Sequence, residues 1–148
     1  NYVDIKGFFE NEMERLTKTK TFVNKTVSDY NKTESKTISN INWKNELSLF
    51  IESDINKPAW KNSYKISRDT NQIRYTALDS SLRTRQIVIK KGLDGDLKYI
   101  DILNRTKNNL YQSYEHLTYR TDSIYQIDKN QHILLIGDHR YLISGKFN

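Results

Sequence analysis

Residues 72–91, QIRYTALDSSLRTRQIVIKK, contain two strand patterns on either side of a polar turn. Apolar residues alternate with polar ones on both sides, as expected for strands that bury one face. The Asp-Ser-Ser segment between them has the side chains that tight turns favour. A three-residue loop, Ser80 to Leu82, collects the apolar side chains on one face, whereas a two-residue loop would divide them between two faces. The longer loop is therefore predicted, and its cross-strand pairs are Ile73 with Ile89 and Tyr75 with Ile87.

The same arrangement of short strand patterns and polar turns recurs from Tyr64 to Phe147. The predicted turns are residues 69–71, 79–81, 92–95, 107–109, 121–123, 128–130 and 137–139. Connections this short leave no room for crossover helices, so neighbouring strands must be antiparallel. About seven strands result, and their accumulated twist should curl the sheet. The prediction is an α+β fold, in which a curled antiparallel β-meander (a half-barrel or open barrel of about seven to nine strands) packs on two N-terminal helices.

The N-terminal third supplies those helices and a hairpin. Asp4 can cap a helix that runs to about Lys18, and the glutamates at 10, 12 and 14 are expected on its solvated face. Asn42 opens the strongest helix pattern, which Asn56 suits as a left-handed stop. Residues 21–38 predict a polar hairpin at the edge of the sheet, with a turn at 29–32, where exposed lysines discourage edge-to-edge pairing. The predicted apolar stripes are Ile5, Phe9, Met13 and Leu16 in the first helix, and Trp43, Leu47, Phe50, Ile51 and Ile55 in the second.

Length and composition favour a single domain, residues 1–148, with a formal net charge of +6. The sequence has no cysteine, which excludes disulfides, thiolate metal sites and a thiol nucleophile. No apolar run is long enough to span a bilayer. Because Asn1 is not an initiator methionine, the sequence is expected to be part of a longer precursor.

The segment from Glu46 to Tyr64, ELSLFIESDINKPAWKNSY, resembles a segment found in a family of small cell-envelope lipoproteins of Gram-negative bacteria. Similar later segments are residues 76–79, 104–112, 123–129 and 145–147. This resemblance implies an export signal, a lipid-modified cysteine just upstream of Asn1 and attachment to a membrane through that anchor. It also implies a periplasmic or surface-facing domain. It assigns no catalytic or binding residue, and the anchoring cysteine is not in this sequence.

No catalytic, cofactor or metal site is predicted. His132 and His139 bracket an expected strand at residues 133–136, which would hold them about 23 Å apart. Glu115 and His116 are successive strand residues, so they should point to opposite faces. The serines lie in no Gly-x-Ser-x-Gly elbow, and the few glycines form no phosphate loop.

The resemblance to envelope lipoproteins therefore implies a non-enzymatic domain, and binding is its expected activity. The hypothesis is that the curled sheet and the second helix leave a partly apolar groove for a lipid, peptide or glycan segment. Candidate groove residues, each also a candidate for plain core, are Trp43, Phe50, Trp60, Tyr75, Tyr111 and Tyr119. The alternative is a structural or assembly subunit that binds an envelope partner. Nucleic-acid binding is disfavoured, because basic residues alternate with tyrosines but an RNA-recognition signature is missing.

Overall fold

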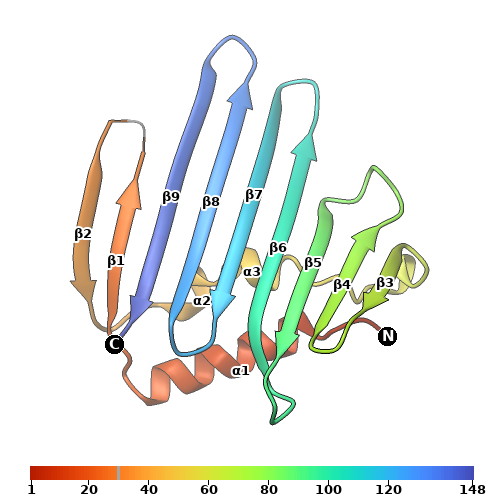
Figure 1. Cartoon of the computed structure of the whole chain (residues 1–148). Coiled ribbons are helices and arrows are strands. Elements are labelled where there is room, and N and C mark those ends of the chain that lie inside the picture. Colours follow the sequence, from red (N-terminus) through yellow and green to blue (C-terminus); the bar gives the residue numbers. More distant parts are fainter. Residues whose placement is uncertain (30) are drawn as a thin grey trace.

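The computed structural model describes residues 1–29 and 31–148, and its centre is one nine-stranded antiparallel sheet (Figure 1). Seven of the strands form the predicted meander between Tyr64 and Phe147, and the curled α+β arrangement is confirmed. The sheet is open, with β2 at one edge and β3 at the other. The strands are β1 (Val23–Ser28), β2 (Thr33–Ile38), β3 (Tyr64–Arg68), β4 (Gln72–Ala77), β5 (Thr84–Lys91), β6 (Leu97–Lys107), β7 (Tyr111–Arg120), β8 (Ile124–Ile133) and β9 (Gly137–Phe147).

The register predicted for the β4–β5 hairpin is confirmed. Ile73 pairs with Ile89, and Tyr75 pairs with Ile87. Tyr75, Ile87 and Ile89 are all buried, so the longer loop does place the apolar set on the core face.

The hairpin of β1 and β2 lies at the edge of the sheet, as predicted, and it extends the sheet beyond its last strand. β1 pairs antiparallel with β9, so the N-terminal hairpin closes against the C-terminal strand. In its turn, the Asp29 carboxylate accepts the backbone N–H groups of Asn31 and Lys32, both at 2.8 Å. Residue 30, in the middle of the predicted turn, lies outside the described residues.

Helix α1 (Ile5–Lys18) begins and ends where the sequence predicts. Asp4 is its N-cap, and its carboxylate accepts the Gly7 N–H at 2.9 Å. Ile5, Phe9 and Leu16 are buried. The prediction for Glu12 is wrong, because this residue is only 8% exposed and lies within the buried stripe.

The second predicted helix is divided. Residues 42–55 form α2 (Trp43–Glu46) and α3 (Ser48–Ile51), separated by Leu47 and followed by an irregular stretch up to the short 3₁₀ helix η1 (Pro58–Trp60). The irregular stretch carries Ser53 to the sheet, where its hydroxyl accepts the Asn104 side-chain amide at 2.9 Å. Asn56 is not a left-handed stop; its amide donates to the backbone carbonyls of Tyr2 and Val3 instead.

Two predicted turns near the C-terminus are wrong. β8 continues through residues 128–130, and β9 already begins at Gly137. The chain turns at residues 134–136 instead, with Leu135 and Gly137 at positive φ (69° and 109°). Continuous pairing of β8 with β7 and β9 explains the longer strand, because a break at 128–130 would leave ladder hydrogen bonds unmade.

The core lies between the helices and one face of the sheet. Figure 1 shows α1 beside the ends of the strands where both chain termini lie, while the hairpins of β6–β7 and β8–β9 extend away from the helices. Apolar side chains from all three α-helices and from the strands form one buried cluster. The molecule therefore has a helix-covered end and an end where the sheet projects alone.

Candidate functional site

Four of the six predicted groove residues lie in the core. Trp43, Phe50, Tyr75 and Tyr119 are each at most 4% exposed. Tyr119 is the centre of an aromatic cluster, with the rings of Phe9, Phe50 and Phe147 within 6.0 Å of its own, centroid to centroid. These rings fill the space between the helices and the sheet, so they pack against one another.

The other two predicted residues, Trp60 and Tyr111, are half-buried and belong to separate parts of the fold, since Trp60 precedes the edge strand β3 and Tyr111 lies in the inner strand β7. Trp60 is in η1, where the Lys57 ammonium lies 4.7 Å from its ring centroid. Tyr111 begins β7, opposite Ile133. The structure therefore does not bring the six residues together around one groove.

Open grooves border α1 instead. One, of about 640 Å³, lies beside α2 and has Met13, Ile41 and Trp43 among its lining residues. Another, of about 610 Å³, lies between α1 and the turns that follow β5 and β7, and we call it the α1 groove. Its apolar lining comes from Val3, Phe8 and Leu97, and its charged lining comes from Asp4, Glu12, Arg15, Lys91, Asp96, Lys98 and Asp122.

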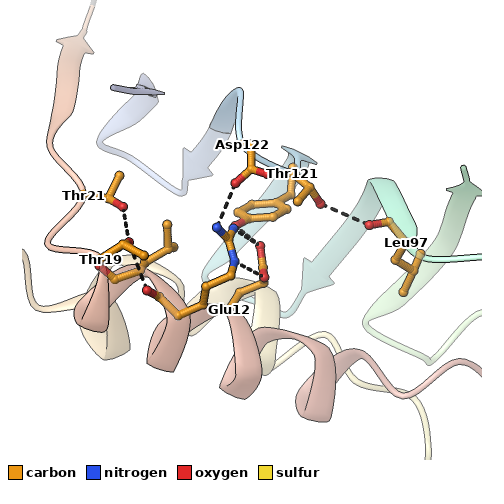
Figure 2. Close-up of polar contacts among 9 residues, drawn as sticks. Glu12, Thr19, Thr21, Leu97, Thr121 and Asp122 are labelled. Atoms are coloured by element: carbon orange, nitrogen blue, oxygen red, sulfur yellow. Dashed lines mark hydrogen bonds and ion pairs between the residues drawn. The ribbon is translucent and has the colours of Figure 1, made fainter. Parts of the chain in front are cut away.

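A network of charged and polar side chains holds one wall of the α1 groove in place (Figure 2). Arg15 donates to both carboxylate oxygens of Glu12, at 3.0 and 2.9 Å, and forms an ion pair with Asp122 at 2.8 Å. The Tyr119 hydroxyl donates to Glu12 at 2.8 Å. The hydrogen bond with Glu12 raises the pKa of the Arg15 guanidinium, so this group stays charged. Burial raises the pKa of Tyr119, and the Glu12 charge raises it further, so the phenol stays protonated and remains a donor.

Hydrogen bonds also join the two turns of the α1 groove. The Thr121 hydroxyl donates to the Leu97 carbonyl at 3.1 Å (Figure 2), and the Thr121 N–H donates to the Lys98 carbonyl at 3.1 Å. The groove therefore has a fixed floor and wall, with Lys91 and Lys98 exposed on its rim.

Glu12 is the residue of this network that the sequence interpretation missed. The signal was present, because positions 5, 9, 12 and 16 follow the helical period, and Glu12 occupies one of them. A carboxylate within an apolar stripe is costly unless it is paired, and Arg15 one turn later is the residue that can pair with it.

Two further carboxylates on the core side are also paired. Glu46 accepts from the Tyr125 hydroxyl and forms an ion pair with Lys25 at 2.9 Å. Glu115, 7% exposed, contacts Arg83 at 2.8 Å and Lys129 at 3.5 Å, and it accepts the Asn104 amide at 3.2 Å. In each case a basic side chain compensates the charge of an acid with little exposure to solvent, which is the arrangement of a structural ion pair.

The histidines occupy different positions from those predicted. His132 and His139 do not bracket a strand; the chain turns between them, and they lie on the neighbouring strands β8 and β9. His132 faces Asp138, whereas His139 is the next residue along β9 and so points to the opposite face. The prediction for Glu115 and His116 is confirmed, because Glu115 is buried while His116 bonds Asp101 at 2.8 Å on the exposed face. Among residues 1–29 and 31–148, no three His, Asp or Glu side chains are grouped so that they could hold a metal ion.

No protein-family model matches this chain, and no curated protein matches it either. Within the described part of the chain, no helix has the length and apolar character needed to cross a membrane. The resemblance to envelope lipoproteins therefore stays a prediction from the sequence.

Proposed function

We propose that this chain is a non-enzymatic domain of the bacterial cell envelope that binds an extended peptide segment in the α1 groove. The observation that carries the proposal is the groove itself, lined by both apolar and charged side chains, with one wall fixed by the network of Glu12, Arg15 and Tyr119. Its volume of about 610 Å³ lies in the range of small-ligand sites.

The lining of the α1 groove favours a peptide over an acyl chain. An acyl chain would need an enclosed apolar cavity, but aromatic rings fill the core between the helices and the sheet. A peptide offers both polar backbone groups and side chains of either charge. The rim carries side chains of both signs, Lys91 and Lys98 with Asp96 between them in the sequence, which suits such a mixed ligand.

Placement in the cell envelope rests on the resemblance of residues 46–64 to envelope lipoproteins. In this proposal a lipid anchor upstream of Asn1 attaches the domain to a membrane.

The proposal predicts a peptide-dependent change at the α1 groove. Amide signals in two-dimensional NMR would be followed while three probes are added separately: a pool of synthetic hexapeptides, a peptidoglycan digest and dodecylphosphocholine. Shifts with hexapeptides at Phe8, Gly95, Leu97 and Thr121 are expected. A response only to the digest or only to the detergent would favour a glycan or a lipid instead and contradict the peptide proposal.

A pair of matched double variants tests whether the peptide binds in the α1 groove. Lys91→Glu with Lys98→Glu reverses two rim charges, and we expect at least about tenfold weaker binding of the acidic hexapeptides, because each reversed charge removes an attraction and adds a repulsion. Lys36→Glu with Lys65→Glu changes the net charge equally at exposed positions outside both grooves beside α1. Equal weakening in both double variants would show that binding depends on overall charge and not on the groove.

A further inference from the structure

The end of the sheet farthest from α1 carries an exposed apolar tip, formed by Leu110, Leu134, Leu135 and Ile136. Their exposed fractions are 68%, 56%, 99% and 70%. They come from the two neighbouring turns that join β6 to β7 and β8 to β9, which project at the end of the sheet away from the helices (Figure 1). The Leu134 N–H donates to the Leu110 carbonyl at 2.9 Å, so one hydrogen bond holds the two turns together.

The requirements of the turns themselves do not explain why these side chains are apolar. Tight turns favour Gly, Asn, Asp, Ser and Pro, yet the β8–β9 turn has three aliphatic residues in succession. Leu135 also adopts φ 69°, a left-handed conformation that is strained for a bulky side chain. Polar residues would satisfy this turn at lower cost, so the apolar side chains point to a function outside the fold.

The residues just behind the apolar tip have the chemistry of a membrane–water interface. Tyr111, at the start of β7, and Tyr114, which is 46% exposed, carry rings with a polar end. Exposed Lys107, His132 and His139 lie at the same end of these strands, together with Asp138, which is hydrogen-bonded to His132. Tyrosines and basic side chains next to aliphatic ones suit the headgroup region above a hydrocarbon layer.

We propose that the apolar tip inserts into the surface of a phospholipid bilayer. The tip is a convex projection, and a fluid bilayer accepts such a shape without a complementary pocket. Two short turns reach only the boundary between headgroups and acyl chains, roughly 5–10 Å deep, so the association is shallow and reversible. This site lies at the opposite end of the sheet from the α1 groove and does not depend on a peptide ligand.

Vesicle flotation with the whole chain tests the proposal. The probe is a suspension of large vesicles of phosphatidylethanolamine and phosphatidylglycerol, compared with vesicles of phosphatidylcholine alone. Leu135→Asp is expected to reduce the vesicle-bound fraction at least tenfold. Leu93→Asp is the matched control, since Leu93 is also fully exposed in a turn, but at the α1 end, and the variant changes the net charge equally.

The insertion depth of the tip and the salt dependence of vesicle binding provide two further tests. A Leu135→Trp variant should show fluorescence quenching by brominated lipids that exceeds the quenching of the native Trp43 and Trp60. Binding should persist at 0.5 M NaCl, because insertion of aliphatic side chains is not screened. The absence of vesicle binding, equal loss in Leu135→Asp and Leu93→Asp, or complete loss in high salt would overturn the proposal.

Discussion

The absence of a side chain at Gly145 leaves room for one ring of the aromatic core. It lies directly opposite Tyr125 on β8, and a β-carbon at this position would overlap the Tyr125 ring. The ring in turn donates its hydroxyl to Glu46, so it cannot easily move aside. Gly145→Ala should therefore lower the free energy of unfolding by about 1–3 kcal/mol through overpacking. Urea denaturation measures the change, and Ser144→Ala, on the next residue of β9, should stay close to the parent chain.

The raised pKa of Tyr119 predicts that the stability of the folded chain decreases at alkaline pH. Burial raises the pKa of Tyr119 above its ordinary value of about 10, so the unfolded chain ionises first as pH rises. The stabilising contribution of the neutral phenol is complete below pH 10 and is lost progressively above it. The equilibrium constant for unfolding should then rise by up to about tenfold per pH unit. Tyr119→Phe should be less stable at neutral pH, because it leaves Glu12 with one donor fewer, but its stability should fall less steeply between pH 10 and 11. Exposed Tyr114→Phe should keep the parent slope, and identical slopes in all three proteins would contradict the assignment.

The start of α1 is fixed by a local contact that the sequence made evident. Asp4→Ala removes the acceptor of the Gly7 N–H and should cost about 1 kcal/mol, within the usual range for an N-cap. Chemical denaturation would show the loss, and Lys6→Ala, on an exposed position of the same helix, should cost little. A loss of the same size in both variants would mean that the cap contributes nothing of its own.

Patterns of alternation and helical period predicted which elements form and which faces they bury. The β4–β5 register followed from the apolar side chains alone, because a slip of one residue would have exposed them. The end of α3 at Ile51, before the predicted Ile55, did not follow, because Ser53 just beyond it contacts Asn104, a residue far along the chain. The turn at 134–136 was misplaced because its residues are aliphatic, contrary to the composition of ordinary turns.

The candidate site was harder to predict than the fold. Periodicity identified Trp43, Phe50, Tyr75 and Tyr119 as facing inward, and they do. It could not show whether the space they face is a groove or is filled by the helices, because that depends on the volume of all the packed side chains. The α1 groove is formed by turns and by the flank of a helix, where no periodic pattern marks the residues.

At the scale of the whole molecule, the sheet separates two surfaces of different chemistry. The α1 groove lies at the helix-covered end of the sheet, and the apolar tip lies at the opposite end. The strand β9, which runs between the two ends, has 11 residues. A strand of that length spans about 35 Å. A peptide in the groove and a bilayer at the tip would therefore not compete for the same space.

The last strand, β9, joins the N-terminal hairpin to the rest of the sheet. β9 pairs with β1 on one side and β8 on the other, so it joins the N-terminal hairpin to the meander. A chain ending at Ile136 would leave the β1–β2 hairpin without its neighbour and uncover the buried rings of Tyr125 and Trp43. Because an isolated two-stranded hairpin is marginally stable in water, we expect this chain to lose dispersed NMR signals and cooperative unfolding. A synthetic peptide of residues 137–148 added in trans should restore both, whereas a scrambled peptide of the same composition should not; cooperative unfolding of the shortened chain alone would show that β9 is dispensable.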